Sequence, residues 1–220
     1  MALDIEQARF NMIEQQVRTW EVLDLRVLDV LKAVPREDFV PSRYRRMAFV
    51  DLRLPLAMGQ VMMKPVEEGR MLQALAVEEG HSVLEIGTGS GFSTACLTAL
   101  GGKVLSVDVY PELADTAAAR LDRLGFSAVE VRCVDALSDG FQPGCRFDRV
   151  VVTASVAEIP EAMLSWVAPG GRLFAVRGPS PAMEAVCLQR QADGSWITDS
   201  LFETDLPRLV GAEDVPVFDF

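Results

Sequence analysis

The segment 83–91, with the sequence VLEIGTGSG, contains the residues whose spacing most clearly suggests chemistry. Glycines at alternate positions allow a tight turn and a close approach of the backbone to a ligand, and the exposed N–H groups of such a loop can receive polar ligand groups. Asp108 stands about 20 residues after Gly87, at the end of the next β-rich run. A carboxylate there can accept hydrogen bonds from ribose hydroxyls. The pattern therefore predicts a binding site for a nucleoside-containing ligand.

The glycine spacing separates two classes of nucleoside site. A dinucleotide fingerprint would need a glycine at position 92, which is Phe92. The form E-x-G-x-G-x-G, which begins here at Glu85, is typical of class I S-adenosylmethionine methyltransferases, and Asp135 stands where that class commonly places an acid near the adenine amino group. Both Asp108 and Asp135 have a structural alternative, because aspartate also favours helix caps and turns. With S-adenosylmethionine as cofactor, the expected binding residues are Glu85, Gly87, Thr88, Gly89, Ser90, Gly91, Asp108, Val109, Asp135 and Ala136.

The elements around these residues are predicted to form a doubly wound α/β fold with a mostly parallel, seven-stranded sheet. Continuous apolar runs are typical of parallel strands that are covered on both faces. The predicted strands are 82–86, 103–109, 128–134, 149–154 and 172–178. The predicted helices between them are 94–100, 111–124 and 160–168, and residues 169–171 are expected to form a turn.

The sheet is expected to end in an antiparallel hairpin. Asp193 and Gly194 stand between two β-rich runs, and this dipeptide is a strong hairpin signal. The class I methyltransferase fold likewise has a seventh strand that runs against the others. Residues 211–220 have no predicted structure.

The N-terminal region is predicted to be a helical extension. Asp4 and Gln7 resemble a capping box, and Asp24 can cap a second helix within residues 1–34. One face of the first helix is expected to carry Phe10, Ile13, Val17 and Trp20.

The chain from residue 35 to 80 links this extension to the glycine loop. Residues 35–65 are expected to form loop and short strands, and a helix is expected from Pro65 to Gly80. We expect residues 1–65 to pack as N-terminal helices and substrate loop on a cofactor-binding domain of residues 66–220, as one structural unit.

Bulk composition excludes several classes of function. Of the 220 residues 50% are hydrophobic, which suffices for a sizeable core, and a net charge of −11 disfavours binding to nucleic acid or anionic membranes. We find no run of ~18 apolar residues that would span a membrane, and no signal peptide. The four cysteines form no CxxC pair, which predicts buried, reduced thiols in a cytoplasmic protein, with no metal site.

Several blocks of the sequence resemble, in order, the protein-L-isoaspartate O-methyltransferase family. These blocks are 27–41, 48–60, 83–95, 147–155, 160–173 and 205–211. The family methylates the carboxylate of L-isoaspartyl residues in damaged proteins, so the resemblance implies S-adenosylmethionine as cofactor and isoaspartyl proteins or peptides as partners. A carboxylate is already ionised at neutral pH and needs no general base. The single histidine, His81, is accordingly expected to be a solvated loop residue.

The loop 55–65, with the sequence PLAMGQVMMKP, departs from the family pattern. The family has a histidine, a threonine and a serine where this chain has Met58, Val61 and Met63, and its hydroxyl groups help to hold the substrate carboxylate. A buried carboxylate without donors suffers a desolvation penalty of several kcal/mol. The resemblance places the acceptor between this loop and the tip of the fourth strand. The catalytic residues that it implies are Asp51, Gln60, Val61, Met63 and Thr153.

Three interpretations of this loop remain open. The acceptor carboxylate could be held by loop N–H groups together with Lys64, Arg53, Thr153 or Ser155, which would preserve isoaspartyl activity. Alternatively, the acceptor is a less polar small molecule. A third hypothesis is a non-catalytic cofactor-binding or scaffold protein whose residues 5–34 bind a partner, although the intact glycine loop argues against it. No feature predicts the oligomeric state.

Overall fold

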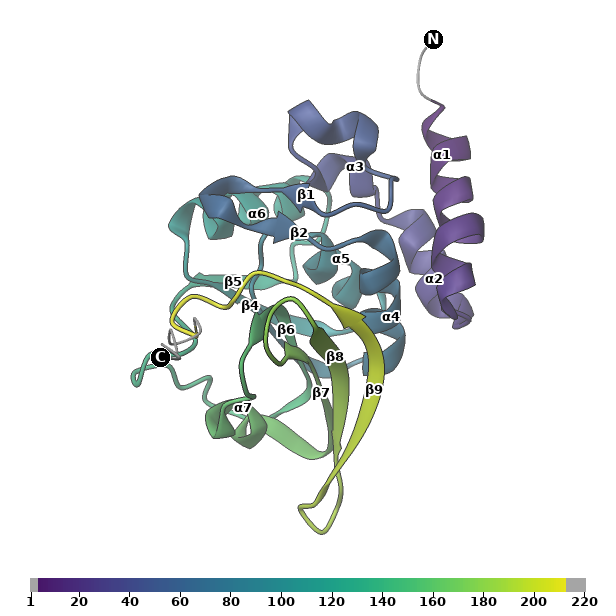
Figure 1. Ribbon diagram of the computed structural model, residues 1–220. Helices are drawn as coiled ribbons and strands as arrows, with labels where there is room; N and C mark the ends of the chain where they lie inside the picture. The colour runs from purple at the N-terminus through teal and green to yellow at the C-terminus, as the bar shows by residue number, and fades with distance from the viewer. Residues whose placement is uncertain (1–3, 213–220) are drawn as a thin grey trace, which may run out of the picture.

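The computed structural model describes residues 4–212 and contains a central seven-stranded sheet covered by helices (Figure 1). Its strand order is β5-β4-β3-β6-β7-β8-β9. The bounds are β3 Ser82–Ile86, β4 Lys103–Asp108, β5 Glu130–Cys133, β6 Phe147–Val156, β7 Val167–Arg177, β8 Met183–Arg190 and β9 Trp196–Thr204. The strands β3 to β7 pair in parallel, which confirms the predicted α/β class.

The C-terminal hairpin is confirmed, but its strand directions differ from the expectation. β8 pairs antiparallel with both β7 and β9. The sixth strand therefore runs against the sheet, and the seventh, β9, runs in the same direction as the parallel strands. Two short connections account for this: residues 178–182 join β7 directly to β8, and the turn at Asp193 and Gly194, where Gly194 has φ of +87°, joins β8 to β9. Neighbouring strands joined by so short a link run antiparallel.

Two hydrophobic clusters cover the two faces of the sheet. Successive strand residues point to opposite faces, so Val83 belongs to one cluster and Leu84 to the other. The first cluster includes side chains from the N-terminal helices and from α4 and α5; the second includes Met163 of α7. The helices are α1 Ile5–Met12, α2 Leu25–Ala33, α3 Arg36–Phe39, α4 Pro65–Leu75, α5 Phe92–Ala99, α6 Pro111–Arg123 and α7 Glu161–Ser165.

The helical extension is confirmed, with one error in its predicted buried face. Asp4 and Asp24 cap α1 and α2 through hydrogen bonds from the N–H groups of Gln7 and Arg26. Of the four residues predicted to share a face, Ile13 and Val17 are buried, whereas Phe10 is 56% and Trp20 is 38% exposed. The helix widens to π geometry at Ile13–Val17 and tightens to a 3-10 turn at Arg18–Trp20, so the assumed period of 3.6 residues is not kept.

Three further boundaries differ from the sequence-based expectation. α4 ends at Leu75 and not at Gly80, because Ala76 adopts a left-handed conformation with φ of +45°. Residues 169–171 lie inside β7, beside a register shift, and do not form a separate turn. The segment 35–65 contains α3 and a 3-10 helix, Ser42–Met47, in addition to the short strands β1 Leu54–Pro55 and β2 Val61–Met62.

The four cysteines were predicted to be buried. Cys96 and Cys187 are buried as predicted, but Cys133 and Cys145 are exposed, so the prediction was wrong for these two. No helix within residues 4–212 combines the length and the apolar character that a membrane span requires.

Candidate active site

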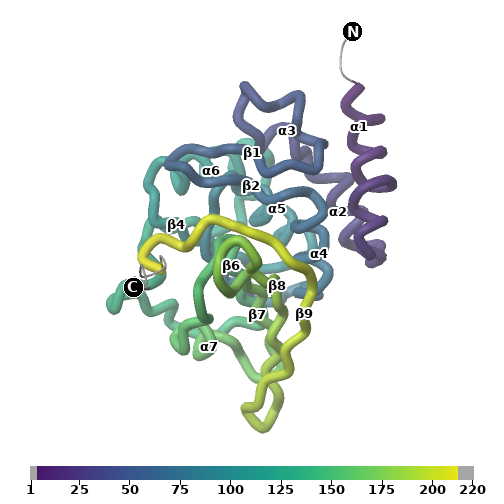
Figure 2. Tube along the Cα trace, viewed as in Figure 1, coloured from purple at the N-terminus to yellow at the C-terminus, as the bar shows by residue number. Residues whose placement is uncertain are grey.

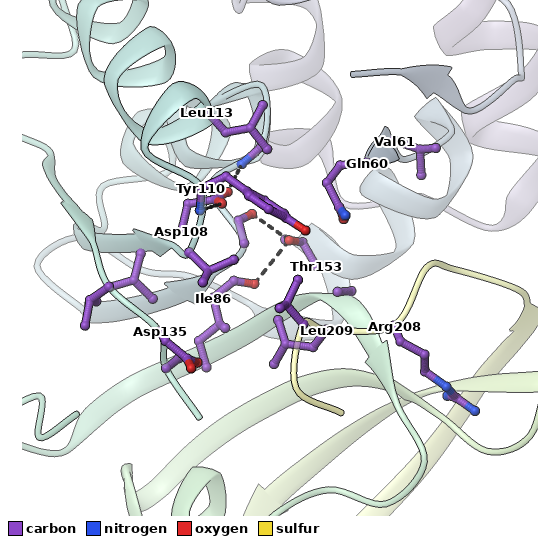
Figure 3. Close-up of a pocket in the computed structure, with 18 residues that line it drawn as sticks. Gln60, Val61, Ile86, Asp108, Tyr110, Leu113, Asp135, Thr153, Arg208 and Leu209 are labelled. Carbon is purple, nitrogen blue, oxygen red and sulfur yellow. Dashed lines mark hydrogen bonds between the residues drawn. The ribbon is translucent and has the colours of Figure 1, made fainter. Parts of the chain in front are cut away.

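A pocket lies at the carboxyl ends of the central strands, where β3, β4 and β6 meet the loops that follow them (Figure 3). Its volume is about 590 Å³, counting the space at its open mouth. Open α/β sheets bind ligands at this edge, near the point where the strand order reverses, which here is at β3. We call this opening the central pocket.

The glycine loop forms the floor of the central pocket. Gly87 has φ of +97°, and a Cβ atom added to it would lie 2.3 Å from Oγ1 of Thr153. The Thr153 hydroxyl donates hydrogen bonds to the carbonyl oxygens of Gly87, at 2.6 Å, and of Ile86, at 3.1 Å. Glycine is thus required at position 87 both by its conformation and by the close approach of β6.

Asp108 lies at the tip of β4, in the wall of the central pocket. One carboxylate oxygen accepts a hydrogen bond from the N–H of Gly89, at 2.9 Å, and the other accepts one from the N–H of Tyr110, at 3.0 Å. The side chain therefore anchors the glycine loop and also faces the pocket. A carboxylate has about four acceptor positions, so these two bonds leave capacity for ligand hydroxyls.

Asp135 lies on the other side of the same wall. Its Oδ1 accepts a hydrogen bond from the N–H of Leu137 at 2.8 Å, so it shapes a turn as well as lining the pocket. Val109 and Ala136, the neighbours of the two acids, also line the central pocket.

Glu85 does not reach the central pocket, in contrast to the expectation. Its side chain is fully buried beneath the glycine loop, where it accepts hydrogen bonds from Ser106, at 2.7 Å, and from Thr94. Burial raises the pKa of Glu85 to about 7, although these hydrogen bonds oppose the shift. Thr88 shares a hydrogen bond of 2.6 Å with Ser106, so this buried network connects the loop to β4 and α5.

Gly91 also differs from its predicted role. A Cβ atom there would meet Ala117 and Leu121 of α6 at 3.3 to 3.5 Å. This glycine therefore permits the packing of the loop against a helix, and it does not line the central pocket.

A second opening, the small pocket, lies between the loop 55–65 and the glycine loop. Its volume is about 300 Å³, counting the open space at its mouth, and it shares Val61, Gly87, Gly89 and Thr153 with the central pocket. Its other lining residues are Leu56, Met62, Met63, Glu68, Thr88, Ser90 and Ser93. The structure thus brings together the predicted residues of the loop and those of the glycine motif.

An ion pair that the sequence reasoning missed lies behind the small pocket. Arg36 and Glu68 are 1% and 2% exposed and contact each other directly. Arg36 also donates hydrogen bonds of 2.8 Å to the carbonyl oxygens of Ala48 and Met63, which fixes the loop to the core. Burial raises the pKa of Glu68 to about 8, against the opposing effect of Arg36.

Two residues predicted to be catalytic, Gln60 and Asp51, lie in different surroundings. Gln60 lines the central pocket, and Figure 3 shows its side chain converging with those of Tyr110 and Thr153. Asp51 lines neither pocket: its Oδ1 is buried without a hydrogen-bond partner in the described part of the chain. No cluster of His, Cys, Asp and Glu side chains within residues 4–212 could hold a metal ion.

The sequence reasoning missed several residues of the central pocket. Tyr110 and Leu113 follow Asp108, and Arg208, Leu209 and Val210 belong to a segment after β9 that crosses the carboxyl ends of the strands (Figure 2). The resemblance singles out residues 205–211, but nothing in their local pattern indicates that they close over the glycine loop. Only the tertiary structure brings them there.

The sheet order, the glycine loop and the acids at the tips of β4 and β5 define a class I S-adenosylmethionine methyltransferase fold. A model of the family Protein-L-isoaspartate(D-aspartate) O-methyltransferase matches residues 7–213. The chain therefore belongs to this family, as its sequence blocks indicated.

Curated relatives agree with this assignment, and a solved structure shares the fold. The chain is 38% identical over 183 residues to a protein-L-isoaspartate O-methyltransferase of Methanoculleus marisnigri, which covers 83% of each chain. It is 34% identical to protein-L-isoaspartate O-methyltransferase 2 of Marinobacter nauticus, over 97% of each chain. A Plasmodium falciparum structure assigned to the same enzymes, solved with S-adenosyl-L-homocysteine, is 16% identical with a TM-score of 0.77 and covers 94% of this chain and 99% of that one.

Proposed function

We propose that the protein is an S-adenosylmethionine-dependent methyltransferase that acts on the carboxylate of L-isoaspartyl residues in proteins or peptides. Family membership over residues 7–213 is the observation that carries this proposal. The geometry of the glycine loop supports it, because a functionless scaffold would not need the close approach at Gly87.

The residues of the two pockets suit the parts of S-adenosylmethionine. Asp108 would accept hydrogen bonds from the ribose, and Asp135 would lie near the adenine. The methionyl end would occupy the small pocket, where exposed loop N–H groups suit its carboxylate and the carboxyl group of Glu68 suits its ammonium. When bound, this cofactor supplies an electrophilic methyl group on its sulfonium sulfur. Loss of the methyl group converts that sulfonium to a neutral thioether, which is the leaving group.

The acceptor chemistry requires positioning and exclusion of water more than proton transfer. An ionised carboxylate attacks the methyl carbon without losing a proton, so no general base is needed. His81 lies in the loop before β3, where its Nδ1 accepts a hydrogen bond from the N–H of Glu78 at 3.0 Å, away from both pockets. We propose that Gln60 instead orients the acceptor in the central pocket, beside the Thr153 hydroxyl that holds the glycine loop.

Methyl transfer to a matched pair of peptides tests this proposal. The peptides are identical except that one contains an isoaspartyl and the other an aspartyl residue, and the transferred label is measured with and without S-adenosylhomocysteine as competitor. Transfer to the isoaspartyl peptide alone is expected. Equal transfer to both peptides, or none although the cofactor binds, would contradict the proposal. The second outcome would favour a less polar acceptor, in keeping with Val61 and Met63 in the loop.

A further inference from the structure

A third opening, the arginine groove, adjoins the central pocket at Val61. It is lined mainly by Arg53, Val61, Met183, Asp205, Pro207 and Arg208 and has a volume of about 740 Å³, counting the open space at its mouth. Val61 and Arg208 line both this groove and the central pocket. The groove therefore adjoins the place where methyl transfer would occur.

Arg53 lies on one side of the groove in a fixed position. Its guanidinium donates hydrogen bonds to Glu67, at 2.7 Å, and to Thr204, at 2.6 Å, which connect it to α4 and β9. Its Nε is buried without a hydrogen-bond partner among residues 4–212. A guanidinium has five N–H donors, so these contacts orient the group without exhausting its capacity to bind an anion.

Arg208 lies on the other side, at the junction with the central pocket. Its guanidinium donates hydrogen bonds to the carbonyl oxygen of Gly178, at 2.8 Å, and to the hydroxyl of Ser155, at 3.4 Å. In Figure 3 this guanidinium points away from Asp108 and Tyr110, on the far side of Thr153. The positive charge of Arg208 therefore lies away from Asp108, one of the acids that suit the cofactor.

The other groups considered for the acceptor carboxylate are unsuitable. The hydroxyl of Thr153 donates to two carbonyl oxygens of the glycine loop, and that of Ser155 donates to the carbonyl oxygen of Leu206 at 2.8 Å. Lys64 lines neither pocket nor the groove. The small pocket would bury the acceptor carboxylate beside the carboxyl group of Glu68 and two methionines, where desolvation opposes it.

We propose that the acceptor polypeptide lies in the arginine groove and that Arg208 binds its reacting carboxylate, with Arg53 as a second cation. This inference rests on the proposed function. It explains how Val61 and Met63 can replace hydroxyl residues: charge-assisted hydrogen bonds from guanidinium groups are stronger than those from hydroxyls. Asp205, the one acid within residues 4–212 that lines the groove, opposes the two arginines.

Steady-state kinetics with an isoaspartyl peptide test the assignment in five variants. Arg208→Gln and Arg53→Gln are expected to raise KM for the peptide by roughly 10-fold or more, since hydrogen bonds to charged groups contribute about 1.5–3 kcal/mol. Arg208→Lys should retain much of the affinity, because it keeps the charge. Asp205→Asn should lower KM. Arg46→Gln, an exposed arginine outside the groove, is the matched control and should change nothing.

The affinity for S-adenosylhomocysteine, measured by calorimetry, distinguishes the groove from a general loss of structure. It is expected to stay within about twofold of the wild type in every variant, because the Arg208 guanidinium, although Arg208 lines the central pocket, points away from Asp108. Asp205→Asn keeps the inference testable even if the arginine variants unfold, since it predicts a gain. If KM were unchanged in the Arg208, Arg53 and Asp205 variants while the wild type is active, the groove would not be the acceptor site, and the proposed function would still hold. A wild type without isoaspartyl activity would overturn both.

Discussion

The two sides of the site are built in different ways. On the cofactor side, the glycine loop joins two central elements, β3 and α5, and the oxygens of Asp108 are anchored by backbone N–H groups at 2.9 and 3.0 Å. On the acceptor side, β1 and β2 contain two residues each, and Met58 at the tip is 51% exposed with φ of +57°. A rigid frame on one side and a short hairpin on the other allow the acceptor site to change while the cofactor site is kept.

The sharpest test of this comparison uses two glycines with similar backbone conformations. Gly87 and Gly125 have φ of +97° and +88°, but only Gly87 has a neighbour, Oγ1 of Thr153, within contact distance of an added Cβ. Gly87→Ala is expected to reduce kcat/KM by roughly 100-fold, because displacing the loop misplaces the reactants. Gly125→Ala should destabilise the protein by about 1–2 kcal/mol and leave activity unchanged. Similar activity in both variants would show that the cofactor side is less rigid than described.

A second test removes the acid at the tip of β4. Asp108→Ala is expected to weaken binding of S-adenosylhomocysteine by roughly 10- to 100-fold, because the ligand loses charged hydrogen bonds and the loop loses an anchor. Asp115→Ala, an exposed acid on α6, is the matched control for the change in charge. Calorimetry measures both. Unchanged affinity in Asp108→Ala would mean that the ribose lies elsewhere.

The glycine loop and Asp108 also show what a sequence can predict. Spacing alone indicates both of them, because a strand, a tight turn and a helix must follow one another along the chain. Glu85 was placed at the ligand by the same motif, yet it lies beneath the loop with Ser106 and Thr94. A motif gives the residue type at a position, whereas the direction of the side chain depends on packing from other segments.

The acceptor side was harder to predict because its residues come from distant parts of the chain. The arginine groove combines residues near position 53, near position 183 and from 205 to 208. The ion pair between Arg36 and Glu68 likewise joins α3 to α4. Neither arrangement has a local periodicity, so only the fold reveals it.

A third test concerns the buried acid under the glycine loop. The pKa of Glu85 is raised from 4.5 to about 7 in the folded protein, so its contribution to stability is fully present below pH about 4.5 and is lost as pH rises to 7. The unfolding free energy of the wild type should therefore fall relative to that of Glu85→Gln by roughly 3 kcal/mol between these limits. Denaturant unfolding at several pH values measures this difference, and a difference independent of pH would contradict the assigned burial.

The smallest expected effect is on the acceptor side. Val61→Thr restores a hydroxyl at the junction of the pockets, with little change in volume. It should alter kcat/KM for an isoaspartyl peptide by less than about threefold, since a neutral hydrogen bond contributes only about 0.5 kcal/mol where cations already hold the carboxylate. A gain of more than 10-fold would show that the arginines do not replace the missing hydroxyl.

A structure of the protein with both S-adenosylhomocysteine and an isoaspartyl peptide tests the whole account most directly. We expect the adenosyl group against Asp108 and Asp135, the methionyl end beside Glu68, and the peptide in the arginine groove with its carboxylate bound to Arg208. A peptide carboxylate found in the small pocket, or an adenosyl group away from Asp108, would contradict the division of the site into these two sides.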